Sequence, residues 1–110
     1  MKVVRASEGV PYEAAKHFNC WSTRKLTMEK ETQRLTVSFS HFLPNGGTEM
    51  IGGAPEKMYY IVKGSMIVTT KSGEATLHEG DLIYFAGDEE RSIRIPGNEV
   101  CSILVCIVKT

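Results

Sequence analysis

Short segments of alternating character, separated by turn residues, are the feature that most constrains the fold of this chain. In residues 34–43, RLTVSFSHFL, apolar and polar side chains take turns, which predicts a strand that the turn Pro44-Asn45-Gly46-Gly47 ends. Further strands are predicted over residues 56–62, 65–71, 74–78, 82–85, 91–95 and 100–108. Several short strands at this spacing predict an all-β sandwich or barrel.

The N-terminal part of the chain departs from that pattern. Proline in the first turn, with Glu13 close behind it, predicts a helix of about two turns over Pro11 to Phe18 that covers one end of the barrel. Lys2 to Ala6 is predicted to be an edge strand, and because such strands often pair across subunits we expect a homodimer. The 110 residues suit one domain, with residues 1–30 as N-terminal strand and covering segment and 33–108 as barrel core.

Charge and cysteine content exclude several classes of partner. Thirteen basic residues balance thirteen acidic ones, which gives no basic surface for nucleic acid or for an anionic membrane. No run of about 18 apolar residues predicts a transmembrane helix, and the N-terminus lacks the apolar region of a signal peptide. The three cysteines form no C-x-x-C pair, so we expect reduced thiols and a cytoplasmic protein.

Two segments resemble the motifs of the cupin superfamily. Residues 44–64 read PNGGTEMIGGAPEKMYYIVKG, and the last nine residues are similar to the usual E-E-x-Y-Y-V-x-x-G, with Gly64 as the closing glycine. Residues 77–93 read LHEGDLIYFAGDEERSI, in which Gly80-Asp81 matches the second motif, L-x-x-G-D. The resemblance covers most of the chain and implies a small single-domain cupin, which is an all-β double-stranded β-helix, or jelly-roll barrel.

The resemblance breaks at the metal ligands. With Gly64 as anchor, the two histidines of the first motif fall on Ile51 and Gly53, and the glutamate falls on Lys57. The histidine of the second motif falls on Arg91. Isoleucine and glycine side chains cannot coordinate a metal, and cationic side chains repel one. The resemblance therefore implies a cupin that lacks the metal-binding residues, and we expect neither a metal nor another cofactor.

The same alignment predicts a charged pocket. In the family these positions point into the barrel, which implies that Ile51, Lys57 and Arg91 point inward, and strand periodicity adds Glu49 and Tyr59. Ile51, Lys57, Tyr59 and Arg91 are our predicted substrate-binding residues, with Arg91 placed to hold a carboxylate. The alternative is a salt bridge from Glu49 to Arg91 or Lys57 that plugs an idle barrel.

Two residues are candidate general bases, and two classes of function stay open. Glu49 is the first candidate and His41 the second, although the sequence does not fix the face on which His41 lies. His17 and His78 are expected at the surface. One hypothesis is an isomerase or lyase that acts on a small organic acid or carbonyl compound. The other is a non-catalytic module that binds or senses a small molecule, and the fold alone cannot choose between them.

Overall fold

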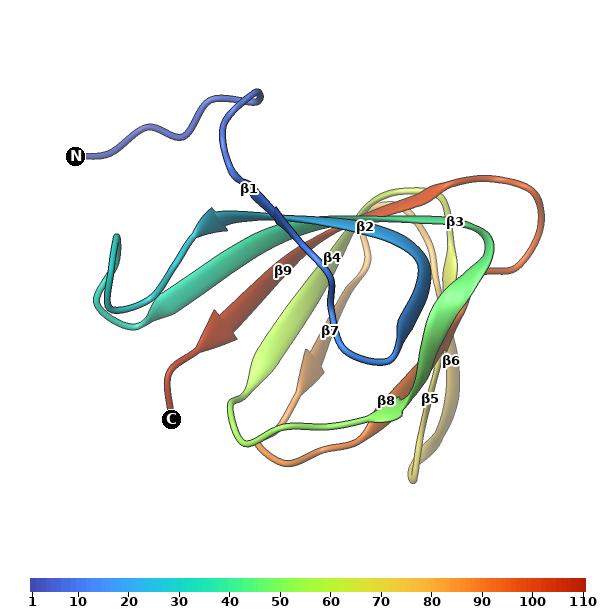
Figure 1. Ribbon diagram of the computed structural model, residues 1–110. Helices are drawn as coiled ribbons and strands as arrows, with labels where there is room; N and C mark the ends of the chain where they lie inside the picture. The colour runs from blue at the N-terminus through green and yellow to red at the C-terminus, as the bar shows by residue number, and fades with distance from the viewer.

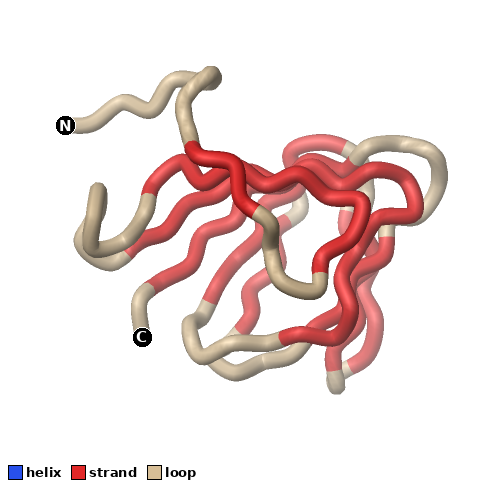
Figure 2. Tube along the Cα trace, in the orientation of Figure 1, coloured by secondary structure: helices blue, strands red, loops and turns tan.

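The computed structural model describes every residue, from 1 to 110, and contains nine strands and no helix (Figure 1, Figure 2). The strands are β1 (Val10–Tyr12), β2 (His17–Leu26), β3 (Leu35–Ile51), β4 (Lys57–Lys63), β5 (Met66–Thr70), β6 (Gly73–Leu77), β7 (Leu82–Phe85), β8 (Arg91–Arg94) and β9 (Cys101–Val108). The structure contains no transmembrane helix. The predicted all-β barrel is confirmed.

The strands form two walls around one interior. The first wall has the order β2-β3-β9-β4-β7, with β1 on the outer edge of β2, and the second has the order β3-β8-β5-β6. β3 has 17 residues and takes part in both walls, because its first half pairs with β9 and its second half with β8. Figure 1 shows β3 running along the first wall and then turning down beside β8. This strand therefore forms the corner of the barrel.

The corner lies at residues 44–47, which the sequence analysis expected to end the strand. The backbone of Gly47 passes so close to the carbonyl of Ile93 that any side chain at this position would collide with it. Asn45 has a φ of 66°, a left-handed conformation that asparagine adopts more readily than most residues. The predicted strand end is wrong because glycine lets the backbone turn the corner without breaking the ladder.

The helix predicted over Pro11 to Phe18 is also wrong. β1 ends at Tyr12 and β2 begins at His17, so the segment forms the turn of a hairpin. Lys16 has a φ of 59°, which a right-handed helix does not contain. A helix of two turns has little stability of its own, whereas the hairpin gains backbone pairing with β2.

The first nine residues form no strand within this chain. In Figure 1 the N-terminus extends away from the barrel. The exchange of residues 2–6 between two subunits therefore stays a prediction. β2, which the sequence analysis counted with the covering segment, is instead a strand of the first wall and pairs with β3 along most of its length.

Apolar side chains from both walls form the core, but one strand presents its polar face to the interior. Ile61, Met66 and Ile103 are among the fully buried core residues. In the first half of β3 the buried positions are Thr36, Ser38, Ser40 and Phe42. Because hydroxyl-bearing side chains occupy these inward positions, this part of the interior is polar and holds a cavity.

Candidate functional site

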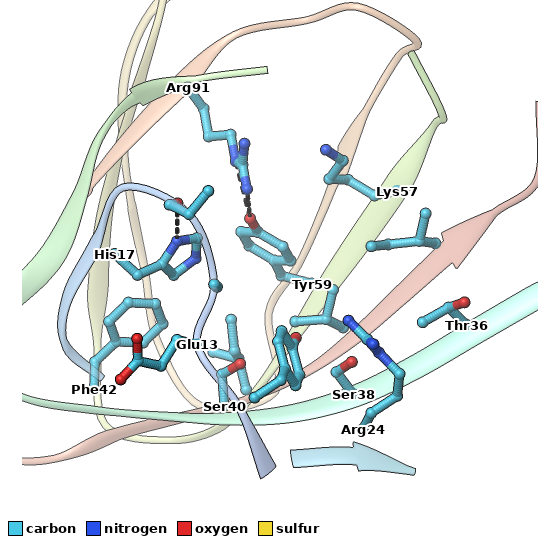
Figure 3. A pocket seen from close by; sticks show the side chains of 16 residues that line it. Glu13, His17, Arg24, Thr36, Ser38, Ser40, Phe42, Lys57, Tyr59 and Arg91 are labelled. Atoms are coloured by element: carbon cyan, nitrogen blue, oxygen red, sulfur yellow. Dashed lines mark hydrogen bonds between the residues drawn. The ribbon is translucent and has the colours of Figure 1, made fainter. Parts of the chain in front are cut away.

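The cavity has a volume of about 280 Å³ and lies inside the barrel (Figure 3). β3, β4, β8 and β9 contribute most of its walls, and the β1–β2 hairpin contributes the rest. Apolar side chains of β3 and β9 form one part of the lining, and its polar groups include His17, Arg24, Ser38, Lys57, Tyr59 and Arg91. This volume lies just below the range of pockets for drug-sized ligands, so the cavity suits a smaller molecule.

Arg91 is held rigidly in this cavity. Its side chain is buried, and Nε and Nη2 donate hydrogen bonds to the phenol oxygen of Tyr59 at 2.9 and 2.6 Å. Nη1 donates to the backbone carbonyl of Ile51 at 2.8 Å. Burial raises the pKa of Tyr59, so the phenol stays protonated at neutral pH. Because its oxygen accepts both bonds from Arg91, its own O–H proton is left for a ligand.

Lys57 is the second buried cation that faces the cavity. It lies two residues before Tyr59 on β4, so both side chains point to the same side of the strand, as Figure 3 shows. The side chain is buried, and its ammonium group is part of no ion pair. Burial, together with the like charge of Arg91, lowers the pKa of Lys57.

No carboxylate of the protein neutralises these two cations. The ion pairs of the chain lie elsewhere, between Lys2 and Glu31, His78 and Asp81, and Lys109 and Glu29. Glu13 is the one carboxylate that lines the cavity, and it is an exposed residue of the β1–β2 turn. The cavity therefore carries a local excess of positive charge.

Glu49 does not line the cavity, contrary to the prediction. Thr48 is the inward-facing residue of this part of β3, and the register with β8 shifts between Thr48 and Ile51. A bulge of this kind inserts an extra residue, so counting in steps of two from Ile51 back to Glu49 fails. Glu49 is exposed, and the alternative salt bridge from Glu49 to Arg91 or Lys57 does not form. Ile51 contributes its carbonyl to the site, whereas its side chain does not line the cavity.

His41 lies on the outer face of β3. Its neighbour Ser40 points inward, and strand alternation therefore turns His41 outward. The Nδ1 atom lies 2.7 Å from the hydroxyl of Ser102, and the ring packs against Phe39. The histidine lines a separate surface groove, so its predicted role as a base in the barrel is not supported by its position.

His17, which the sequence analysis placed at the surface, lines the cavity instead. Its Nδ1 lies 2.7 Å from the carbonyl oxygen of Ala15, and its ring stacks on Phe42. A carbonyl only accepts, so Nδ1 carries the proton and Nε2 is the basic nitrogen, which faces the cavity in Figure 3. Burial lowers the pKa of His17, and the charges of Arg91 and Lys57 lower it further. The imidazole is therefore neutral near neutral pH.

The residues of this cavity do not fit a metal cofactor. The ammonium nitrogen of Lys57 lies 4.0 Å from the place where a side chain on Gly53 would begin, so a cation stands beside one expected ligand position. Arg91 occupies another. No group of three or more His, Cys, Asp or Glu side chains lies close enough together to hold a metal ion. Three cationic side chains, one imidazole and one exposed carboxylate are an unfavourable donor set for a divalent metal.

A barrel of antiparallel strands in two walls around one interior belongs to the jelly-roll class of β proteins. The family model for the cupin domain matches residues 39–108. The chain therefore belongs to the cupin family, as the resemblance of its two motifs implied. It is also 30% identical to beta-D-galactosidase Rv1717 of Mycobacterium tuberculosis over 108 residues, which cover 97% of this chain and 93% of that protein.

Solved structures of low sequence identity share the fold. The polyketide cyclase RemF from Streptomyces resistomycificus superposes with a TM-score of 0.85 at 17% identity, over 100% of this chain and 80% of that chain. A predicted oxalate decarboxylase from Thermotoga maritima superposes with a TM-score of 0.78 at 19% identity, over 99% of this chain and 100% of that chain. At these identities the similarity shows the fold.

Proposed function

We propose that this chain is a metal-independent cupin that binds a small organic acid in its cavity and removes a proton next to the carbonyl group of that acid. One observation carries the proposal: Lys57 and Arg91 are buried, face the same cavity and have no carboxylate partner in the protein. A buried charge without a counterion is costly. A carboxylate on the ligand supplies the missing anion.

Arg91 is prepared to receive that carboxylate. Three of the five N–H groups of a guanidinium are used, in the bonds to Tyr59 and to the carbonyl of Ile51. One N–H on each terminal nitrogen remains, which is the arrangement that binds a carboxylate in two-pronged fashion. Tyr59 cannot neutralise the guanidinium, because its phenol is protonated. The ammonium group of Lys57 adds a second positive charge.

His17 is the base for the proton transfer. Its neutral Nε2 takes the proton from the carbon beside the carbonyl, and the electron pair of that C–H bond moves to form an enolate. The negative charge develops on the carbonyl oxygen, where the ammonium group of Lys57 and the O–H of Tyr59 stabilise it, while Arg91 holds the carboxylate. Return of the proton to a different atom completes an isomerisation, and departure of a group from the next carbon completes an elimination.

Glycoside hydrolysis is a second candidate, because a relative carries the name beta-D-galactosidase. Most glycosidases use two carboxylates on either side of the bond that they cleave. In this cavity Glu13 is the single carboxylate, and it is exposed in the turn between β1 and β2. The ionisable groups that line the cavity therefore support proton transfer from an organic acid better than hydrolysis of a glycoside.

A non-catalytic binding module is the remaining alternative, since the same cations would hold an acid without turnover. Incubation of the protein with pyruvate or 2-oxobutyrate in D₂O separates the two functions. We expect the signal of the protons beside the carbonyl to disappear from the ¹H NMR spectrum faster with protein than in buffer alone. His17→Gln should abolish the acceleration, and the matched variant His41→Gln should preserve it, because His41 lies outside the cavity.

Binding without acceleration would establish the non-catalytic module in place of the enzyme. If neither acid binds and neither exchanges its protons, the proposal is wrong for this substrate class.

A further inference from the structure

Arg24 and Ser38 form a polar pair at a part of the cavity that the proposed function does not use. The two residues are directly opposite each other in the pairing of β2 with β3. Opposed residues of antiparallel strands project to the same side of the sheet, and both of these side chains line the cavity. In Figure 3 they lie at the other end of the cavity from Arg91.

Both side chains contain a buried polar atom without a partner. Ser38 is 1% exposed, and its hydroxyl makes no hydrogen bond. The Nε atom of Arg24 is also buried and makes none. A third such atom, the hydroxyl of Thr48, does not belong to the cavity lining. Buried polar groups are nearly always paired, so two unpaired ones on adjacent strands of one cavity indicate a missing ligand group.

The neighbouring hydroxyls show that pairing is possible in this part of the barrel. Ser22 and Ser40 bond to each other at 2.9 Å, and the hydroxyl of Thr36 accepts the backbone N–H of Met28 at 3.2 Å. Ser38 lies between Thr36 and Ser40 on the same face and is the one hydroxyl of this row that remains free. Within this row the protein therefore pairs the hydroxyls of Thr36 and Ser40 and leaves that of Ser38 available.

Arg24 is held in place by an aromatic ring instead of an anion. Its guanidinium carbon lies 4.2 Å from the centre of the ring of Tyr12, a cation–π contact. Because this contact orients the side chain without using Nε, the N–H on that atom stays available as a donor. The pair thus offers one fixed donor from Arg24 and one hydroxyl from Ser38 that can donate or accept.

We propose that Arg24 and Ser38 form a second subsite that receives a hydroxyl group of the ligand, so that the ligand is a hydroxylated organic acid of the sugar-acid class. The inference rests on the proposed function, which places the carboxylate at Arg91 and Lys57. A cavity of about 280 Å³ equals the liquid volume of roughly nine water molecules, which suits an acid of about six carbons. We expect such a chain to place its carboxylate at Arg91 and a hydroxyl group at Arg24 and Ser38.

A hydroxyl fits this subsite better than a second carboxylate does. One hydroxyl group accepts from Nε of Arg24 and donates to the oxygen of Ser38, so it satisfies both unpaired atoms. A carboxylate could also accept from both groups, but Arg24 is only half-buried, so its charge, unlike those of Arg91 and Lys57, does not require a counterion from the ligand.

Four linear six-carbon compounds test the inference by calorimetric titration: gluconate, hexanoate, adipate and sorbitol. We expect gluconate to bind at least about tenfold more tightly than hexanoate, because a site built to bond a hydroxyl rejects the analogue that lacks it. Ser38→Ala should lower the affinity for gluconate about tenfold and leave that for hexanoate unchanged. Ser102→Ala is the matched control, since Ser102 is a buried serine that bonds to His41 outside the cavity.

The results of these titrations distinguish a failure of the hydroxyl subsite from a failure of the proposed function. Equal affinities for gluconate and hexanoate, or no effect of Ser38→Ala, would overturn the hydroxyl subsite while leaving an acid-binding cavity. Tightest binding of adipate, lost in Arg24→Gln, would replace the hydroxyl with a second carboxylate. Binding of sorbitol in the absence of binding by any of the three acids would contradict the proposed function itself.

Discussion

Arg91 of β8 and Tyr59 of β4 form one hydrogen-bonded unit inside the barrel, with two donors of the guanidinium on a single phenol oxygen. The unit joins a strand of one wall to a strand of the other, since β4 and β8 are not neighbours in the sheet order. It fixes the direction of the guanidinium before any ligand arrives. Preorganisation of this kind reduces the entropy that binding would otherwise cost.

Removal of the phenol oxygen tests this unit. Tyr59→Phe leaves two buried N–H groups of Arg91 without an acceptor, which should lower the free energy of unfolding by about 1–3 kcal/mol. Denaturant unfolding measures the change. Tyr60→Phe is the control, because Tyr60 is the exposed neighbour on the same strand and should change stability little. Equal effects of the two substitutions would show that the Arg91–Tyr59 bonds add nothing.

The lowered pKa of Lys57 predicts that the stability of the ligand-free protein depends on pH. Its pKa in the folded protein lies below the unfolded value of 10.5, so the charged form destabilises the fold at every pH below the folded pKa. The penalty disappears as the pH rises from the folded pKa towards 10.5. Lys57→Met should therefore stabilise the ligand-free protein at pH 7.5 and lose this advantage by about pH 10.5, as measured by urea unfolding. Lys63→Met, an exposed change on the same strand, should show no such trend.

The pH profile of proton exchange should report His17. Its pKa lies below 6.5, so the rate should rise as the pH climbs through that lowered value and then become constant above pH 6.5. NMR rates from pH 5 to 8 provide the measurement. A rate that keeps rising through pH 8 would identify a base other than His17.

Glu49 and His41 should have no part in ligand binding, because both side chains lie outside the cavity. Glu49→Gln and His41→Gln should each leave the affinity for a small carboxylate within about twofold of the unchanged protein. Titration of both variants beside Arg91→Gln checks this. A loss of about tenfold in either variant would mean that the side chain reaches the ligand from the outer face.

The fold and the inward direction of three site residues, Lys57, Tyr59 and Arg91, can be predicted from strand alternation and the two sequence motifs. The alternation of β4 and the position of Gly64 fix the register of that strand and predict that Lys57 and Tyr59 point inward, where both line the cavity. Arg91 follows in the same way from Gly80-Asp81 in the second motif. Binding of a substrate by these residues stays a prediction.

The remaining site residues depend on features that strand periodicity does not contain. Glu49 was misplaced because a bulge after Thr48 changes the count. His17 was misplaced because its neighbours have the composition of a helix start, although pairing with β3 decides the structure. Ser38 belongs to the polar face of its strand, and a polar face more often faces solvent. In this barrel the polar face of β3 points inward, which the sequence pattern alone does not predict.

The most direct test of the central claim, that the cavity binds an anion, is calorimetric titration with hexanoate and its neutral amide, hexanamide. We expect that hexanoate binds, that hexanamide does not, and that Arg91→Gln weakens the binding of hexanoate by about 10- to 100-fold, the equivalent of roughly 1.5–3 kcal/mol for a hydrogen bond to a charged group. Arg91→Lys should restore little, because an ammonium group cannot make the two-pronged contact. Equal binding of acid and amide, or an affinity for hexanoate that Arg91→Gln leaves unchanged, would contradict this claim.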